Sequence, residues 1–538
     1  MLTGDQRWVC LRSSLRVNYS MTQQSARGRG VLLFAGLSGL LLAVSFYGKL
    51  PSLIAWIALV PLLVAIRGRG VVVSATLSFL CGLCFYPGWS PWVLAPAGVR
   101  WTDALLVWSY CSLYFALFGA LFSLLARHRR VPALLAAPAA WVTAEFLRAN
   151  AFDLAMPLSQ IGHSQYLNLT LIQVASITGV YGLSFLIVMV NALLAEIAVR
   201  RSLPLRESAV VLGLLAAVLL FGAWRLSEPA SGGEGLPVSV VQPNIAQHEK
   251  WDRALRDQHM EKNIRLSKAA AETMPGSLIV WPESAITGFV QKELGLYRAI
   301  SRLARQTHAF LLVGGAGRPK FGSKAFRETT AYNSVFLVNP QGQIQQRYDK
   351  IRLMPFGEFV PYRNLIPWPD YYLQSRDGYA PGAEYTLFDA AGLRFAALIC
   401  WEMYFPELAR EFTRRGAEIL VNMTNEAWFG DSDASRQFFA LSVFRAVENA
   451  VYVVRAANTG ISGFIDPYGR ILSTVEQGGK SVEVAGYAVA DVQRRAETTV
   501  YTRLGEVFAL VNLALCGSLI CVTALRRRSS LTPVRSAA

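Results

Sequence analysis

Histidine and cysteine are scarce in this sequence of 538 residues, which contains five histidines and seven cysteines. The histidines are not clustered as metal ligands are, and the C-x-x-C pair of Cys81 and Cys84 lies inside a long uncharged run. No G-x-G-x-x-G follows a predicted strand, and no Walker sequence is present. The sequence therefore predicts no metal site and no cofactor, and it gives no support for nucleotide binding.

Acidic residues are in the minority: 36 Asp and Glu stand against 52 Lys and Arg, which gives a net charge of +16. Such an excess can indicate nucleic-acid binding, but here the arginines are grouped in short clusters beside apolar runs. Examples are Arg67 and Arg69, Arg127 to Arg130, and Arg526 to Arg528. Basic clusters in these places are typical of membrane orientation, so no nucleic-acid partner is expected.

Charge is almost absent from eight apolar runs, most of which approach or exceed the length of about 20 residues that a helix needs to cross a bilayer. Transporters and channels usually carry paired charges within their spans, so these runs favour a membrane anchor or a lipid-facing platform. The runs are Val31–Tyr47, Leu50–Ile66, Val71–Val99, Ala104–Ala126, Val131–Ala144, Thr170–Leu194, Ala209–Trp224 and Val507–Leu525.

The basic clusters also predict how the chain crosses the membrane, because such clusters face the cytoplasm. Two of them flank the pair of runs Val131–Ala144 and Thr170–Leu194, so the chain must cross an even number of times between them. The short first run, which is followed by Glu145, is therefore counted as a span. The expected division is a cytoplasmic extension at 1–30, in which Met21 is a candidate start, seven transmembrane helices within 31–226, an extramembrane domain at 227–503, a transmembrane helix at 504–526, and a cytoplasmic tail at 527–538.

Short apolar strands alternate with charged helices in the polar segment that follows the linker at 227–235. This alternation, with hairpin turns at Asn339–Gly342 and Asp466–Gly469, predicts a sheet-based α/β layered fold. The predicted strands are Leu236–Val241, Ser277–Trp281, Ala309–Gly314, Tyr332–Asn339, Gln343–Tyr348, Glu418–Asn422 and Val451–Arg455, with helices at Trp251–Glu272, Tyr297–Gln306, Pro406–Arg415 and Ser435–Ala450.

Cys400 is the only cysteine between Leu226 and Glu506, and it ends the apolar strand that begins at Leu393. Strand ends in α/β folds hold reactive groups on rigid supports. A lone thiol in this place is either an inert core residue or a nucleophile.

A nucleophilic cysteine needs a base, and none of the three histidines of this segment stands at a strand end with a turn. Glu283 follows a predicted strand and is a candidate base, the alternative being a helix-capping or surface acid. Lys350 also follows a strand and is a candidate to stabilise an oxyanion, the alternative being a solvated lysine. Because the acid, the cation and the thiol each stand at a strand end, together they indicate a Glu–Lys–Cys site.

These residues give the polar segment a family resemblance. It resembles the nitrilase, or carbon–nitrogen hydrolase, superfamily, whose members carry a Glu-Lys-Cys triad on an αββα sandwich. With seven spans before this domain and one after it, the whole chain resembles the apolipoprotein N-acyltransferase family of the Gram-negative inner membrane. The matching motifs are QPNI at Gln242–Ile245 with Lys250 and Trp251, WPESAI at Trp281–Ile286, YDKIRLMPFGEFVP at Tyr348–Pro361, ICWE at Ile399–Glu402, NEAWFG at Asn425–Gly430 and RAANTGISGFIDPYG at Arg455–Gly469.

The resemblance implies a role for each matching position. Glu283 would be the general base, Lys350 the oxyanion stabiliser and Cys400 the nucleophile. Two supporting acids are implied, Glu358 to orient Lys350 and Glu402 beside the nucleophile. Aromatic residues would line the substrate site, namely Trp251, Trp401 and Trp428. Two positions depart from the family pattern, since Trp401 replaces a common tyrosine and Glu426 a common aspartate.

The resemblance also implies a reaction and a place for it. The enzyme would be an acyltransferase of lipoprotein biosynthesis in the bacterial cell inner membrane, with its catalytic domain in the periplasm. An acyl chain would pass from the sn-1 position of a phospholipid, through a thioester on Cys400, to the α-amino group of the N-terminal S-diacylglyceryl cysteine of an apolipoprotein. The alternatives are a membrane-anchored amidase and a transport or scaffold protein with a degenerate nitrilase domain. The aromatic stretch Phe359–Pro381 is expected to act as a mobile lid, the alternative being an ordinary packed loop.

Overall fold

The computed structural model describes residues 30–126, 131–228, 235–319, 331–368, 378–495 and 497–531, the last without side chains beyond 522. The expected extension at 1–30 therefore lies almost wholly outside the described residues. The same is true of the arginine cluster at 127–130, of most of the linker, and of part of the expected lid, including Tyr371, Tyr372 and Leu373.

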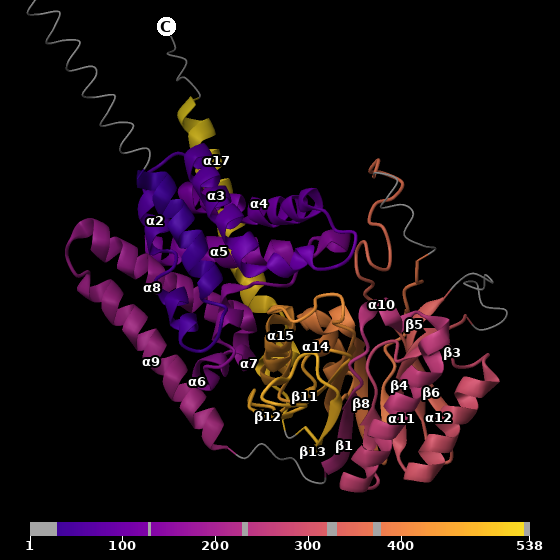
Figure 1. The fold of residues 1–538 in the computed structure, drawn as a ribbon. Helices are drawn as coiled ribbons and strands as arrows, with labels where there is room; N and C mark the ends of the chain where they lie inside the picture. Colours follow the sequence, from indigo (N-terminus) through magenta and orange to yellow (C-terminus); the bar gives the residue numbers. More distant parts are fainter. Residues whose placement is uncertain are drawn as a thin grey trace, which may run out of the picture.

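The first half of the described chain is helical (Figure 1). Four of its helices are long and apolar enough to cross a membrane, namely α3 (Val71–Trp89), α4 (Trp101–Ala126), α8 (Val180–Arg200) and α9 (Leu205–Ser227). Shorter apolar helices are Gly30–Val44, the pair η1 (Pro51–Trp56) and α2 (Val60–Ile66), the pair α6 (Leu169–Ile172) and α7 (Ala175–Thr178), and the part Val507–Val522 of the C-terminal α17 (Val507–Leu531). Between α4 and α6 lies a further helix, α5 (Ala133–Ala149).

Three of the differences between the observed helices and the expected runs have a clear physical cause. Helix α3 ends at Trp89, ten residues before the expected end of its run, and Pro91 begins a short 3₁₀ turn. The run expected from Thr170 is broken at Gly179, where φ is +64° and a side chain would meet the ring of Tyr501. Helix α5 continues through Glu145 and Arg148, because both are buried and bonded to the segment 158–161.

The second half contains two sheets, which confirms the prediction of a sheet-based α/β domain. In the first sheet the strands follow the order β13 (Gly486–Gln493), β1 (Gly235–Gln242), β2 (Leu278–Val280), β4 (Phe310–Gly317), β5 (Tyr332–Val338) and β6 (Ile344–Asp349), with β3 (Ile286–Phe289) also paired to β4. In the second the order is β12 (Ile471–Thr474), β11 (Gly463–Ile465), β10 (Tyr452–Ala457), β9 (Ile419–Thr424), β8 (Leu393–Ile399) and β7 (Phe388–Ala390). The central strands of each sheet are parallel, as helical crossovers require.

The sheets form the inner layers of a four-layer sandwich. Apolar residues of both, such as Val240 and Leu398, belong to one buried cluster between them. Helices α11 (Arg256–Thr273) and α12 (Leu294–Thr307) cover the outer face of the first sheet, where Ile300 and Leu303 pack with Ile279. Helices α14 (Pro406–Arg414) and α15 (Ala434–Asn449) cover the second sheet.

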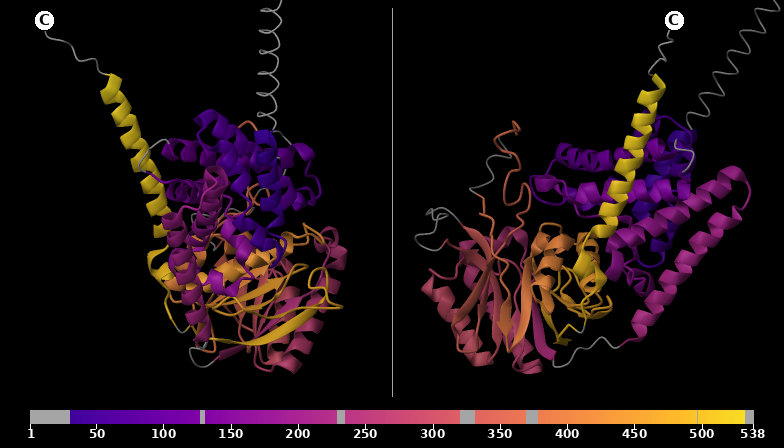
Figure 2. Two further views of the ribbon diagram at one scale, coloured as in Figure 1. Left: turned by 90° about the vertical axis from the view of Figure 1, so that its left-hand side faces the viewer. Right: turned by 180° about the vertical axis from the view of Figure 1, so that it is seen from behind.

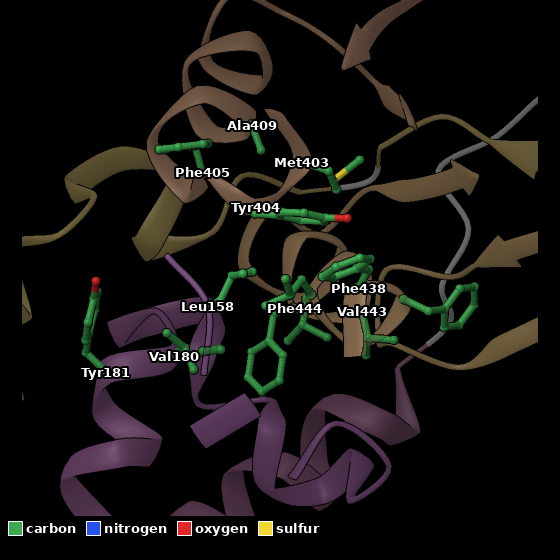
Figure 3. Packing of buried hydrophobic residues seen from close by; sticks show 14 of the residues in the cluster. Leu158, Val180, Tyr181, Met403, Tyr404, Phe405, Ala409, Phe438, Val443 and Phe444 are labelled. Atoms are coloured by element: carbon green, nitrogen blue, oxygen red, sulfur yellow. The ribbon is translucent and has the colours of Figure 1, made fainter. Parts of the chain in front are cut away.

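The helical half sits against α15 and the turn that follows β8, as the views from the side and from behind show (Figure 2). Leu158 and Val180 of the helical half lie beside Phe444 of the α/β domain, with Tyr404 and Phe438 close by in the same buried cluster (Figure 3). Trp92 lies in the same contact region. Its ring packs edge-on against Phe429 and Phe438, and its indole N–H donates to Gln437 at 2.9 Å. The nucleophile candidate therefore lies in a domain that is packed tightly onto the helices.

Replacing Trp92 by alanine should loosen this contact. Trp92 is 8% exposed, its ring packs on Phe429, and its indole N–H donates to Gln437 of the α/β domain. We expect the free energy of unfolding to fall by about 3–5 kcal/mol, the usual cost of a buried aromatic truncation. Thermal unfolding in detergent, followed by circular dichroism, measures the effect. The matched control is Trp101→Ala, since Trp101 is 73% exposed, and an equal shift in the two variants would contradict this account.

Candidate active site

Cys400 stands directly after β8, where the chain leaves the sheet in the 3₁₀ turn η6 (Cys400–Tyr404). Its φ of +54° lies in the left-handed region that residues with a side chain rarely adopt. Such strain persists only where surrounding bonds hold it. One of them is the amide of Asn422 on the neighbouring strand β9, which donates to the Cys400 carbonyl at 3.2 Å.

Lys350 directly follows β6 and is 1% exposed. Its ammonium nitrogen lies 2.9 Å from Oε2 of Glu358 and 3.6 Å from Oε1 of Glu283. A buried ammonium group needs such carboxylate partners, because an isolated buried charge is very costly. The structure thus places the predicted acid, cation and orienting acid in one buried cluster.

Glu283 follows β2 through Pro282 and is held at both carboxylate oxygens. Oε1 accepts from the amide of Asn333 at 2.7 Å, and Oε2 accepts from the backbone N–H of Asn425 at 2.9 Å. Gly314 of β4 lets this loop approach, because a side chain there would lie 2.6 Å from the Pro282 carbonyl oxygen. The carboxylate is consequently fixed in orientation while it remains beside Lys350.

Glu358 is fixed in the same way. It accepts from the Met354 backbone N–H at 2.7 Å and from the Asn333 amide at 2.9 Å, besides its contact with Lys350. The single side chain of Asn333 therefore bonds to both acids that face the lysine.

Glu402 ties together the two chain segments that carry Lys350 and Cys400. Its Oε1 accepts from the hydroxyl of Tyr348 and from the N–H groups of Ile351 and Arg352, at 2.7 to 3.0 Å. Its Oε2 accepts from the N–H of Ile399 at 2.7 Å. The side chain is fully buried, so these four bonds fix the relative positions of the lysine and the thiol.

The charges of the cluster determine the state of the thiol. Burial and, after it, the negative charge of Glu283 raise the pKa of the Cys400 thiol to about 12, while Lys350 acts in the opposite direction. Burial acts to lower the pKa of the Lys350 ammonium, but Glu358, Glu283 and Cys400 outweigh it and the pKa is raised. At neutral pH the site therefore holds a neutral thiol beside an acceptor carboxylate and a permanent cation. That arrangement is suited to forming a thiolate only when a base takes its proton.

The three predicted aromatic residues lie in different surroundings. Trp251 and Trp428 are 43% and 45% exposed, whereas Trp401 is buried against Tyr404 and Phe405. Trp401 also lines a pocket of about 270 Å³ between the two halves of the chain. In the part of the expected lid that the structure describes, Trp368 packs edge-on against Phe356 and donates to the Pro361 carbonyl. Nothing in the structure tests whether this stretch moves, so the lid stays a prediction.

Sequence reasoning missed three residues of the site: Asn333, Asn425 and Lys250. Asn425 and Lys250 belong to motifs that were recognised, but only their tryptophans were given a role. Asn333 was placed in a strand, and no local pattern distinguishes an amide that bonds to two acids from an ordinary strand residue. Among the described residues no three His, Cys, Asp or Glu side chains are grouped as metal ligands.

Replacing Glu402 by glutamine should destabilise the protein, because the new NH₂ group must face an N–H donor in a buried place. We expect a loss of about 1–3 kcal/mol in the free energy of unfolding, the cost of an unsatisfied buried polar group. Thermal unfolding at pH 8 measures it. Glu407→Gln is the control, since Glu407 is partly exposed and its contact with Arg352 is 3.4 Å long. A Glu402→Gln variant as stable as this control would show that the four bonds do not fix the site.

Comparison with known proteins covers both halves of the chain. A sequence profile described as carbon-nitrogen hydrolase matches residues 237–498, and a profile of the apolipoprotein N-acyltransferase N-terminal domain matches residues 38–193. An amidase from Nesterenkonia sp. superposes with a TM-score of 0.38 at 17% identity, over 53% of this chain and 97% of its own. Saccharomyces cerevisiae Nit3, a member of the nitrilase superfamily, gives 0.37 at 18%, over 58% and 99%.

Two curated relatives match over nearly their whole length. The apolipoprotein N-acyltransferase of Geobacter metallireducens is 38% identical over 510 residues, which are 92% of this chain and 96% of that protein. The enzyme of the same name from Chlorobaculum tepidum is 30% identical, over 91% of this chain and 96% of its own. The chain therefore belongs to the apolipoprotein N-acyltransferase family, within the nitrilase superfamily.

Proposed function

We propose that this protein transfers an acyl chain from the sn-1 position of a phospholipid to the α-amino group of the N-terminal S-diacylglyceryl cysteine of apolipoproteins. The chain would be carried as a thioester on Cys400, with Glu283 as general base and Lys350 as oxyanion stabiliser. Glu358 would orient Lys350, and Glu402 would hold the lysine and the thiol in register. Trp251, Trp401 and Trp428 would line the substrate site.

The observation that carries the lipid donor is the pocket between the two halves. One wall comes from Phe152, Asp153 and Ala155, in the segment that connects α5 to α8 in the helical half. The opposite wall includes Ile351 and Trp401, which directly follow Lys350 and Cys400. A soluble amide has no need of a pocket shared with the helical half. A phospholipid in the bilayer does, because its ester must reach the thiol from the side of the helices.

The cluster of Glu283, Lys350 and Cys400 supports the following first half-reaction. Glu283 accepts the thiol proton, and the Cys400 thiolate attacks the ester carbonyl carbon. The tetrahedral oxyanion would be stabilised by the Lys350 ammonium and by backbone N–H groups after Cys400. When the ester C–O bond breaks, the lysophospholipid oxygen takes the proton from Glu283, and a thioester remains on Cys400.

The second half-reaction uses the same groups with a different nucleophile. The α-amino group of the apolipoprotein attacks the thioester and passes a proton to Glu283. The C–S bond breaks, the amide is released, and the Cys400 sulfur regains its proton. Water must be kept from the thioester between the two steps, otherwise the enzyme would act as a phospholipase.

The arrangement in the membrane is part of the proposal. We infer eight spans, seven within 31–226 and one within 504–526, with the catalytic domain at 227–503 in the periplasm of a bacterial inner membrane. The extension at 1–30 and the tail at 527–538 would be cytoplasmic. The basic clusters between the spans support this orientation, as do the apolar helices of the first half.

Incubation of the purified protein with a phospholipid labelled in its sn-1 chain should give a labelled, hydroxylamine-sensitive adduct. The adduct should map to Cys400 and should be absent from Cys400→Ala, because a thioester needs the thiol. Cys111→Ala is the control, since Cys111 is a buried thiol of α4. An adduct that survives in Cys400→Ala would show that another residue carries the acyl chain and would contradict the proposal. No adduct with wild-type protein that still hydrolyses small amides would favour the amidase alternative.

A further inference from the structure

A second lysine lies buried at the site, and the mechanism above leaves it without a task. Lys250 ends the short helix α10 (Gln247–Lys250) and is 2% exposed. Its ammonium nitrogen donates to the backbone carbonyl oxygen of Glu283 at 3.1 Å. A lysine is rarely buried without a partner of opposite charge, so the charges around it must explain its place.

The groups that face Lys250 come from four elements. Glu283, in the loop after β2, and Cys400, at the end of β8, interact with its charge favourably. On the helical side, His259 of α11 interacts with the positive charge of Lys250, and Glu249 of α10 also acts on this imidazole. The negative groups of the catalytic cluster are thus the ones that a charged Lys250 stabilises within the core.

The charge balance of the cluster shows what Lys250 contributes. Glu283 and Glu358 together face the single ammonium of Lys350, which leaves an excess negative charge while the thiol is neutral. Moving the thiol proton to Glu283 keeps that total unchanged but places the negative charge on sulfur. A second cation close to both Glu283 and Cys400 brings the total to zero in either state.

We propose that Lys250 is a positioning residue that holds the Glu283 loop by its carbonyl group and supplies the second positive charge on which thiolate formation at Cys400 depends. Because Trp251 is the next residue, the same contact also restrains the backbone of a proposed site-lining aromatic residue. The proposal rests on the function proposed above in the roles of Glu283 as base and Cys400 as nucleophile, and not in the identity of the acyl donor. Thiol reactivity tests it independently of any lipid.

Because Lys250 can lose its charge, the proposal predicts how the reactivity of the Cys400 thiol changes with pH. Burial lowers the pKa of its ammonium group to about 8, while Glu283 and Cys400 act in the opposite direction. Below that pH the group is charged and favours the thiolate, and as pH rises through about 8 the charge is lost. The rise of thiol reactivity with pH should therefore flatten near pH 8 in the wild-type protein.

The experiment is alkylation of the full-length protein in detergent by iodoacetamide from pH 6 to pH 10, read at Cys400 by peptide mass spectrometry. In Lys250→Met the rate at pH 7 should fall about tenfold, the effect of removing one nearby opposite charge from a thiol. In Lys250→Arg the rate at pH 7 should stay near that of the wild type, and the flattening near pH 8 should vanish because arginine stays charged. A control is Lys262→Met, since Lys262 also donates to a backbone carbonyl group, that of Asn244, and should leave the profile unchanged.

Two results would overturn the proposal. One is alkylation of Lys250→Met at pH 7 that equals or exceeds that of the wild type in a variant whose circular dichroism and melting temperature match those of the wild type; if Lys250→Met is unfolded, the Lys250→Arg variant decides alone. The other is a Lys250→Arg variant that behaves as Lys250→Met does, since Lys250 would then matter through its shape alone. A wild-type protein that shows the predicted profile but forms no acyl adduct from phospholipid would refute the proposed function and leave the role of Lys250 standing.

Discussion

The buried ammonium group of Lys350 is the constraint on which the rest of the site depends. A charge that is 1% exposed must be compensated, and two carboxylates on separate loops compensate it. Each carboxylate is in turn held by an N–H donor, and Asn333 bonds to both. The loops after β2 and β6 therefore cannot move independently, and the base is oriented by the same contacts that neutralise the lysine.

Glu402 connects the lysine to the nucleophile, because it accepts hydrogen bonds from the segments that carry both. Aromatic contacts then connect the turn after the nucleophile to the helical half. The turn η6, which begins at Cys400, carries Tyr404, whose ring stacks on Phe438 at the contact with the helices. Trp92 of the helical half packs on the same phenylalanine. A displacement of the helices would therefore move Phe438 and, through Tyr404, the turn that begins at Cys400. This continuity gives a physical reason for a catalytic domain that does not stand apart from its membrane part.

Much of the α/β domain could be predicted from the sequence, because each strand is a short apolar run and each strand end carries a polar residue. The predicted strands before Glu283, Lys350 and Cys400 end where the structure ends β2, β6 and β8, to within one residue. Strands β3, β7 and β13 were not predicted, because β3 and β7 are short and β13 lacks a clear alternation of apolar and polar residues. The roles of the site residues remain proposals, because position beside a charge partner does not show what a group does in a reaction.

Contacts between distant segments limited the prediction elsewhere. The break at Gly179 depends on the ring of Tyr501, more than 300 residues away, which no local pattern reveals. Glu145 and Arg148 end an apolar run in the sequence, yet α5 passes through them because they bond to residues 158–161. The second lysine was overlooked for the same reason, since only the folded chain brings the Lys250 ammonium group into contact with the Glu283 carbonyl oxygen.

The central claim is that Cys400 carries an acyl group from a lipid to an amine, and a chase experiment tests it most directly. The wild-type protein is acylated with a phospholipid labelled in its sn-1 chain, the donor is removed, and a peptide with an N-terminal S-diacylglyceryl cysteine is added. The account predicts that the label leaves Cys400 and appears in an amide on the α-amino group, and that an N-acetylated peptide receives none. Release of the label as free fatty acid, at the same rate with either peptide, would contradict it.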